Sequence, residues 1–168
     1  MAKPGSKDIP NKAALLTVSD GCFHGKRQDR SGQALRQALQ EAGWPVAASS
    51  IVPDQIDRIQ QQIRTWSSAP EISLIVTTGG TGLAPRDLTP EAVTPLLDKQ
   101  IPGLSELMRL RGLEKTPFAA LSRSLAGTLG KTLILCLPGS PKGALESLQA
   151  VLEILPHAID IAQGRTGH

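Results

Sequence analysis

The chain has 168 residues, 40% of them hydrophobic and 20% charged, so it is long enough to form one domain with a substantial core. Its formal net charge of +3 is spread along the sequence without a basic stripe, and it contains no Tyr, two Phe and two Trp. This composition argues against a nucleic-acid-binding protein and suits phosphorylated small molecules as partners.

The ends of the sequence and its cysteines indicate a cytoplasmic protein. Residues 1–11 are polar with two prolines and lack the apolar centre of a signal peptide, and no apolar run is long enough to span a bilayer. Cys22 and Cys136 form neither a CxxC pair nor a disulfide framework. We expect a flexible leader over residues 1–11, a single domain over 12–162 and a frayed tail over 163–168.

The first half of the chain alternates apolar runs with segments of helical period. Residues 13–18 read as a strand, and Ser31 is expected to cap a helix that Gly43 ends. A second strand over 46–52 is followed by Asp54, which is expected to cap a helix whose apolar face runs from Ile56 to Trp66.

The second half continues the pattern. The expected elements are a strand over 72–76, a helix capped by Thr89 with Pro90 in its first turn, a helix over 103–111, a strand over 133–137 and a helix over 142–155. The segment 119–130 is ambiguous and is expected to hold a short helix and a strand, with a turn at Gly130. Strands that alternate with helices predict an α/β fold with a mostly parallel central sheet.

Unusual polar and glycine residues follow the expected strands. In a parallel sheet with right-handed crossovers, the loops that leave the carboxyl ends of the strands open on one edge, where ligands bind. The candidate binding residues in these loops are Ser19, Asp20, Thr78, Gly79, Gly80, Thr81, Gly82, Arg86, Pro138, Gly139, Ser140 and Lys142. We therefore expect four loops to converge on one cleft.

The glycine loop at Gly79, Gly80 and Gly82 allows backbone N–H groups to approach an oxyanion without interference from a Cβ atom. Its spacing matches neither a Walker A loop nor the Rossmann fingerprint, so a tight connection between elements remains an alternative.

Two carboxylates flank this loop in the expected cleft. Asp54 and Asp87 follow successive strands, so one crossover can bring both to the same edge, where they suit a hydrated Mg²⁺ held between protein and phosphates. Taken singly, Asp54 could be a helix cap and Asp87 a turn residue. The three histidines, His24, His157 and His168, show no ligand spacing, so a zinc site is not expected.

Three motifs together resemble the MoaB/Mog family of molybdenum cofactor biosynthesis. They are Thr77-Thr78-Gly79-Gly80-Thr81-Gly82, Arg86-Asp87-Leu88-Thr89-Pro90-Glu91-Ala92 and Leu137-Pro138-Gly139-Ser140-Pro141-Lys142-Gly143. The resemblance extends to Leu16-Thr17-Val18-Ser19-Asp20, Asp29-Arg30-Ser31-Gly32, Pro102-Gly103 and Leu121-Ser122-Arg123-Ser124. It therefore covers nearly the whole chain.

The resemblance implies a three-layer α/β sandwich, a homotrimer, and transfer of AMP from Mg-ATP to the terminal phosphate of molybdopterin with release of pyrophosphate. By motif match, Asp54 and Asp87 take the places of the two aspartates on which adenylyl transfer depends, and Ser122 that of a pterin-binding serine. A separate protein would insert molybdenum. Two alternatives stay open, namely a non-catalytic pterin-binding or scaffold member of the family and a competence-damage-type nucleotide pyrophosphatase.

Overall fold

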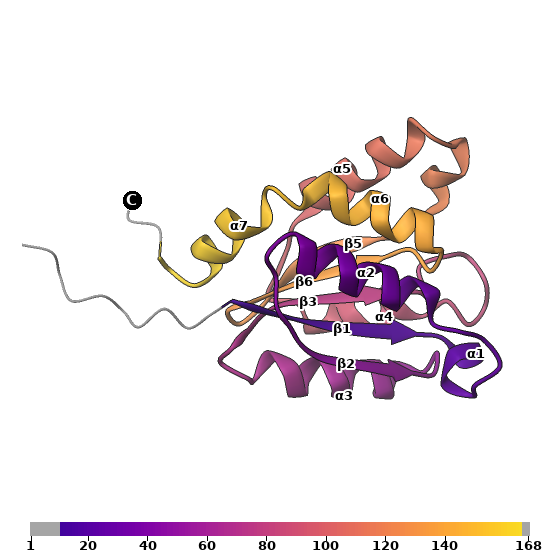
Figure 1. Ribbon diagram of the computed structural model, residues 1–168, viewed down its shortest axis with the longest axis horizontal. Coiled ribbons are helices and arrows are strands. Elements are labelled where there is room, and N and C mark those ends of the chain that lie inside the picture. Colours follow the sequence, from indigo (N-terminus) through magenta and orange to yellow (C-terminus); the bar gives the residue numbers. More distant parts are fainter. Residues whose placement is uncertain (1–10, 166–168) are drawn as a thin grey trace, which may run out of the picture.

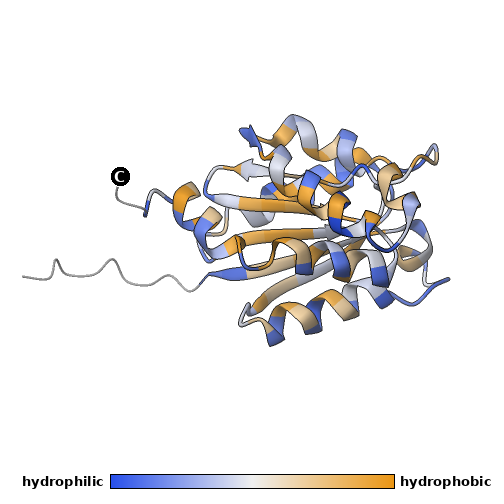
Figure 2. Ribbon diagram, turned by 90° about the horizontal axis from the view of Figure 1, so that it is seen from above, coloured by the Kyte–Doolittle hydropathy of each residue, from blue (hydrophilic) through white to orange (hydrophobic). Residues whose placement is uncertain are grey.

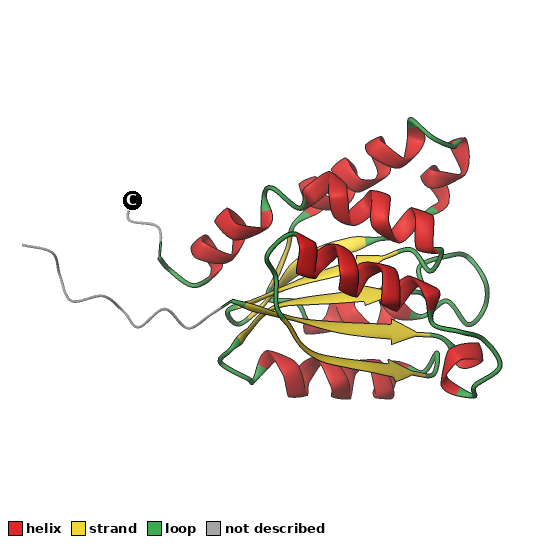
Figure 3. Ribbon diagram, viewed as in Figure 1, coloured by secondary structure: helices red, strands yellow, loops and turns green. Residues whose placement is uncertain are grey.

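A computed structural model describes residues 11–165 as strands and helices in three layers, which confirms the predicted α/β sandwich (Figures 1 and 3). The central sheet has the strand order β2-β1-β3-β6-β5-β4. Its strands are β1 (Lys12–Val18), β2 (Val46–Val52), β3 (Ile72–Thr78), β4 (Lys99–Gln100), β5 (Leu125–Leu129) and β6 (Thr132–Leu137).

The sheet is parallel over β2, β1, β3 and β6, and antiparallel where β5 joins β6 and β4 joins β5. The central strands β3 and β6 are buried at every position because helices cover both faces, which is why their sequences are apolar runs rather than alternating patterns. The edge strand β2 instead alternates between exposed and half-buried positions.

Two groups of helices cover the two faces (Figure 1). One face carries α2 (Arg30–Glu41), α5 (Pro102–Leu113), α6 (Pro141–Val151) and α7 (Leu155–Ala162), and the other carries α3 (Ile56–Ser67) and α4 (Thr89–Val93), the latter continued by the 3₁₀ turn Thr94–Leu96. Leu35, Leu39 and Leu148 belong to the first core, and Ile59 and Ile63 to the second. The apolar strands between these cores are visible in Figure 2.

The expected helix starts at Ser31 and Asp54 are wrong. Helix α2 is capped by Asp29, whose carboxylate accepts from Gly32 N, while the Ser31 hydroxyl donates to Gly139 O at 2.5 Å. Helix α3 begins at Ile56 without a side-chain cap, because the carboxylate of Asp54 accepts from Asp20 N across the sheet edge. In both cases the polar side chain forms a hydrogen bond with a residue distant in sequence instead of capping the nearby helix.

Two further helix predictions need correction. Thr89 is the first residue of α4 rather than its cap, and its hydroxyl donates to Gly79 O at 2.8 Å. The helix expected over 142–155 ends at Val151, and α7 follows from Leu155, where Pro156 lies in the first turn.

The ambiguous segment 119–130 forms the 3₁₀ turn Pro117–Leu121 and strand β5, with a turn at Gly130 as expected. The short strand β4 and the one-turn helix α1 (Asp20–Phe23) were not anticipated. The helix expected over 103–111 is α5, and Leu104 and Met108 on its apolar stripe are buried in the core.

The predicted leader and tail fall largely on residues 1–10 and 166–168, outside the described part of the chain. Of the tail residues that are described, Arg165 forms an ion pair with Asp160 at 2.9 Å and donates to Asn11 at 3.2 Å. Within residues 11–165, no helix is both long enough and apolar enough to cross a membrane.

Candidate functional site

An open cleft of about 840 Å³ lies at the carboxyl-terminal edge of the parallel strands. The loops that follow β1, β2, β3 and β6 all contribute to its wall, as the topology predicts. The expected residues found in this wall are Ser19, Asp54, Thr78, Gly79, Gly80, Asp87, Gly139 and Ser140. Residues from segments more than one hundred positions apart thus form one site.

The turn after β3 requires glycine because other atoms lie very close to its backbone. Gly79 has a φ of +101°, and a Cβ atom there would lie 2.2 Å from Val18 O. Gly80 has a φ of +69°, and its Cβ would lie 2.3 Å from the hydroxyl oxygen of Thr89. A side chain at Gly79 would therefore displace neighbouring backbone and one at Gly80 would displace the Thr89 side chain, while both positions have a positive φ that favours glycine. The backbone of the turn lies directly in the cleft wall.

Two hydrogen bonds hold the loop after β6 against the end of β3 and this turn, and a third ties it to α2. Thr78 Oγ1 donates to Pro138 O at 2.7 Å, and Gly79 N donates to Leu137 O at 3.1 Å. The Ser31 hydroxyl fixes the next carbonyl, that of Gly139. Ser140 then caps α6 by accepting from Gly143 N. These hydrogen bonds therefore fix the position of the loop after β6 in the wall of the cleft.

Asp54 and Asp87 both face this cleft from neighbouring loops. Burial raises the pKa of the Asp54 carboxyl, and the charges of Asp20 and Asp87 raise it further, whereas the backbone hydrogen bond from Asp20 and the charge of Arg86 oppose this shift. Asp87 is fixed within its own loop, since one carboxylate oxygen accepts from Ala84 N at 2.8 Å. A carboxylate that is disfavoured in its charged form by burial and by other carboxylates is suited to a cation.

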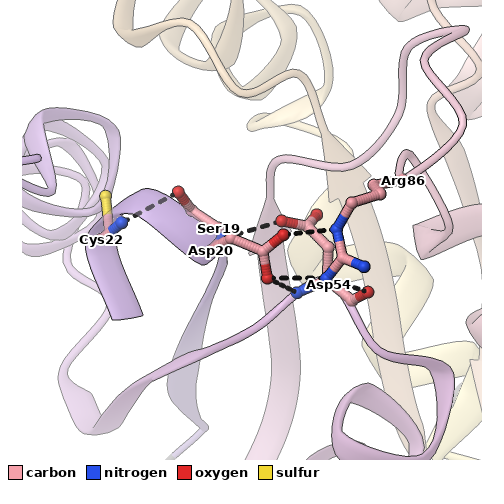
Figure 4. Close-up of polar contacts among 5 residues, drawn as sticks. All are labelled: Ser19, Asp20, Cys22, Asp54 and Arg86. Carbon is pink, nitrogen blue, oxygen red and sulfur yellow. Dashed lines mark hydrogen bonds and ion pairs between the residues drawn. The ribbon is translucent and has the colours of Figure 1, made fainter. Parts of the chain in front are cut away.

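Asp20 connects the loop after β1 to the loops after β2 and β3, through Asp54 and Arg86 (Figure 4). The guanidinium of Arg86 donates to both carboxylate oxygens of Asp20, at 2.6 and 2.9 Å. Asp20 and Asp54 exchange backbone N–H to carboxylate bonds, at 2.8 and 3.1 Å. The Arg86 guanidinium lowers the pKa of the Asp20 carboxyl. Both side chains are thus engaged with each other rather than directed at the cleft, and neither lines it.

The carboxylate pair fits Mg²⁺ better than a transition metal. Within residues 11–165, no group of three or more His, Cys, Asp or Glu side chains gathers as a metal site. Two carboxylates without His or Cys are the protein ligands typical of Mg²⁺ that completes its shell with water and substrate phosphates. Asp54 and Asp87 are the residues that would hold it.

A second hollow of about 350 Å³ adjoins the cleft on the other side of the glycine turn. Gly139 and Ser140 line both hollows, while Thr81, Gly82, Pro138 and Ser122 line the second. The Ser122 hydroxyl lies 2.8 Å from that of Ser124, and Arg109 donates to the carbonyls of both serines.

A family model described as "Probable molybdopterin binding domain" matches residues 14–157, which include both hollows and the loops that form them. The chain belongs to this molybdopterin-binding domain family. The match confirms the resemblance drawn from the loop motifs.

Similar proteins carry names from the same pathway. The chain is 40% identical to a molybdopterin adenylyltransferase of Helicobacter pylori over 89% of its own length and 86% of that protein. It is 47% identical to the molybdenum cofactor synthesis protein cinnamon of Drosophila melanogaster, over 88% of this chain but only 25% of that longer protein. The crystal structure of the molybdopterin biosynthesis enzyme MoaB from Thermus thermophilus superposes with a TM-score of 0.86 at 55% identity, covering 92% of this chain and 97% of that one.

Like Asp20 and Arg86, a third expected residue of this molybdopterin-binding domain lines neither hollow. Lys142 is exposed in the first turn of α6 and lines neither of them. Its proposed contact with substrate stays a prediction that the geometry does not favour.

The molybdopterin-binding domain also has a basic wall that the sequence reasoning missed. Lys26, Arg27 and Arg30 line the first cleft from the segment between α1 and α2. Three cationic residues within five positions after a strand could have indicated an anion site in the sequence. They did not stand out because charged residues are spread evenly along the whole chain.

Proposed function

We propose that this protein adenylylates molybdopterin with Mg-ATP. The observation that carries the proposal is the pair of adjoining hollows that share Gly139 and Ser140, with the two carboxylates in the larger one. A transfer between two substrates needs two sites that meet at the reacting atoms, and hollows of this size suit a nucleotide and a pterin.

The larger cleft is the proposed nucleotide site. Its basic wall of Lys26, Arg27 and Arg30 complements the charge of a triphosphate, and Asp54 and Asp87 are placed to hold the accompanying metal ion. The glycine turn adds backbone to the wall beside them, where N–H groups other than that of Gly79, which donates to Leu137 O, would stabilise phosphate oxygens.

The smaller hollow is the proposed pterin site. It combines apolar side chains, among them Met108 and Phe118, with the hydroxyl of Ser122. A flat heterocycle with polar edges requires such a lining, with a few fixed polar groups that set its orientation. Ser122→Ala is therefore expected to weaken pterin binding and to leave ATP binding unchanged.

The reaction follows from this arrangement. A terminal phosphate oxygen of molybdopterin attacks the α-phosphorus of ATP, the bond from that phosphorus to the bridging oxygen breaks, and pyrophosphate leaves with the electron pair. The attacking phosphate is already ionised, so the chain needs to supply position and charge compensation rather than a general base. Bound Mg²⁺ would neutralise charge that develops on the phosphate oxygens.

Product analysis tests the proposal. With ATP, Mg²⁺ and molybdopterin, we expect an adenylylated pterin and pyrophosphate in equal amounts, measured by mass spectrometry. Binding without turnover would instead identify a scaffold protein. Nucleotide hydrolysis without any modified pterin would identify a pyrophosphatase. Either of these results would overturn the proposal.

We also propose where the protein acts, how it assembles and which kind of protein uses its product. The two cysteines are free, as a reducing cytoplasm would leave them, and we place the activity there. The proposed assembly is a homotrimer, and the proposed consumer of the product is a separate protein that inserts molybdenum.

A further inference from the structure

Arg123 lies outside the residues assigned to either substrate, yet it contacts the loop that carries Asp87 at several points. Its backbone N donates to Thr81 O at 2.9 Å, and its side-chain Nε donates to Gly82 O at 2.9 Å. Nη2 donates to Asp87 O at 2.7 Å, and Nη1 is paired with the carboxylate of Glu91. One residue thus binds the start, the middle and the end of the segment 81–91.

Apart from the bonds of Arg86 to Asp20 and to the Asp54 carbonyl, this segment has few other supports. Residues 81–88 contain neither helix nor strand, and they connect the glycine turn to α4. Asp87 closes a local turn, because its N–H donates to Ala84 O at 2.9 Å and its carboxylate accepts from Ala84 N. That turn fixes Asp87 relative to Ala84 but leaves the whole turn to be placed relative to the cleft. The pairing of Arg86 with Asp20 places one side of the turn against the loop after β1, and the bonds from Arg123 place the carbonyl of Asp87 itself.

We propose that Arg123 is a positioning residue for the metal-holding carboxylate of Asp87, an inference that rests on the proposed function. The guanidinium holds the carbonyl of Asp87 while the Ala84 amide holds its carboxylate, so the residue is fixed at both ends. Outer groups that orient a ligating carboxylate commonly control metal affinity almost as strongly as the ligands do.

The chemistry of arginine suits this task and that of lysine does not. Three nitrogens of one planar group reach three acceptors in different directions, and two of those acceptors are neutral carbonyls. A lysine ammonium is a single point of charge and cannot span them. Arg123→Lys therefore keeps the positive charge beside Glu91 but releases at least one carbonyl of the loop.

The probe is Mn²⁺, whose binding to the protein is followed by electron paramagnetic resonance in the presence of α,β-methylene ATP, which cannot release pyrophosphate. We expect Arg123→Lys to weaken Mn²⁺ binding by about 10- to 100-fold. In steady-state assays the half-saturating Mg²⁺ concentration should rise by a similar factor, while kcat at saturating Mg²⁺ stays near that of the original protein. Arg111→Lys is the matched control, because its exposed pair with Glu114 lies away from both hollows.

A double-mutant cycle separates positioning from general support of the fold. In an Asp87→Asn background, Arg123→Lys should change Mn²⁺ affinity by less than about twofold, since the carboxylate that it positions is gone. An equal loss in both backgrounds, or no loss in the original one, would overturn the proposal. If the original protein bound no Mn²⁺ with the analogue, or if Asp87→Asn bound it equally well, the proposed metal site itself would fail.

A second variant keeps the test decisive should Arg123→Lys fail to fold. Glu91→Gln removes the charge that anchors Arg123 from the solvent side, where Glu91 is 45% exposed. Its Mn²⁺ affinity should fall in the same direction and by less than that of Arg123→Lys. An affinity unchanged in Glu91→Gln, in a protein that melts like the original, would then contradict the proposal.

Discussion

In the free protein, the Asp54 carboxylate has two opposing effects on stability, a favourable hydrogen bond and an unfavourable buried charge. Its carboxylate accepts from Asp20 N and so joins the loops after β1 and β2, yet burial raises its carboxyl pKa because the charged form loses solvation. A cation held by this carboxylate would offset the cost of its charge, which is the pattern expected of a residue that serves function rather than stability.

The first prediction concerns this cost at Asp54. A raised carboxyl pKa means that the stability associated with the neutral form is present at low pH and is lost as the pH rises through the folded-state pKa. Asp54→Asn keeps an oxygen that can accept from Asp20 N but removes the charge. In magnesium-free buffer at neutral pH, we expect it to melt at the same or a higher temperature, with the difference vanishing as acid protonates the original carboxylate.

The matched control is Asp57→Asn, in the first turn of α3 three residues away. Asp57 is exposed and lies where a negative charge favours the helix dipole, so its neutralisation should lower stability by about 0.5 kcal/mol. Scanning calorimetry compares the two variants. A melting temperature of Asp54→Asn that fell below that of the control would show that the Asp54 charge stabilises the free protein.

The two cysteines provide a second residue-level prediction. Burial raises the pKa of the Cys136 thiol to about 12, whereas Cys22 is half-buried and lines the larger cleft, the proposed nucleotide site. Because the thiolate is the reactive form, iodoacetamide should alkylate Cys22 first, and Mg-ATP should slow that reaction. Peptide mass spectrometry reads out both sites. Alkylation of Cys136 as rapid as that of Cys22 in the folded protein would contradict this assignment.

At the scale of elements, the hydrophobic pattern was sufficient to locate the strands and most of the helices, because burial on both faces of the sheet demands long apolar runs. It could not decide the helix starts. Asp29 and Ser31 are both good caps, and the choice between them depends on Gly139, a contact 108 residues from Ser31. The same limit hid the partner of Asp54, which lies 34 residues away.

The candidate site, like the fold, could be predicted from the sequence only in part. The loops, and the carboxylates within them, could be predicted because topology alone brings strand ends to one edge. The roles of Asp20, Arg86 and Arg123 could not, since a sequence does not reveal which charged side chain pairs with another and which remains free for a ligand. The short strand β4 was equally hidden, because it has only two residues.

The third prediction tests the cap of α2. Asp29 accepts from Gly32 N at 2.9 Å and from the Thr17 hydroxyl at 2.7 Å, so it joins the helix start to β1. Asp29→Ala should cost about 2 kcal/mol in the free energy of unfolding, and Ser31→Ala about 1 kcal/mol for its single bond to Gly139. Urea denaturation measures both. A larger loss of stability in Ser31→Ala would contradict this prediction, because it would show that Ser31 stabilises the helix start more than Asp29 does.

At the scale of the whole molecule, the proposed catalytic groups all lie on one chain. The carboxylates, the glycine turn and the basic wall all come from loops of a single sheet edge. The stripe of Leu104, Leu107 and Met108 on α5 packs against the core of the same chain, so it gives no support to an interface. The proposed homotrimer therefore rests on family resemblance, and its subunits should work independently.

Mixed trimers test this fourth prediction. When Asp87→Asn chains are combined with unmodified chains in varied proportion, activity should fall in direct proportion to the unmodified fraction, because each active cleft needs no neighbour. Sedimentation confirms that the trimers are intact. A much steeper fall in activity would mean that the sites are shared or coupled between subunits.

The most direct test of the central claim is the rate of adenylyl transfer by Asp87→Asn at saturating Mg-ATP, with pterin affinity measured in parallel. If Asp54 and Asp87 hold the metal for this reaction, the loss of one carboxylate removes about 3 kcal/mol of transition-state stabilisation, or about a hundredfold in rate. Pterin affinity should stay unchanged, since the second hollow does not include Asp87. A variant that transferred AMP at the original rate would contradict the assignment of this cleft.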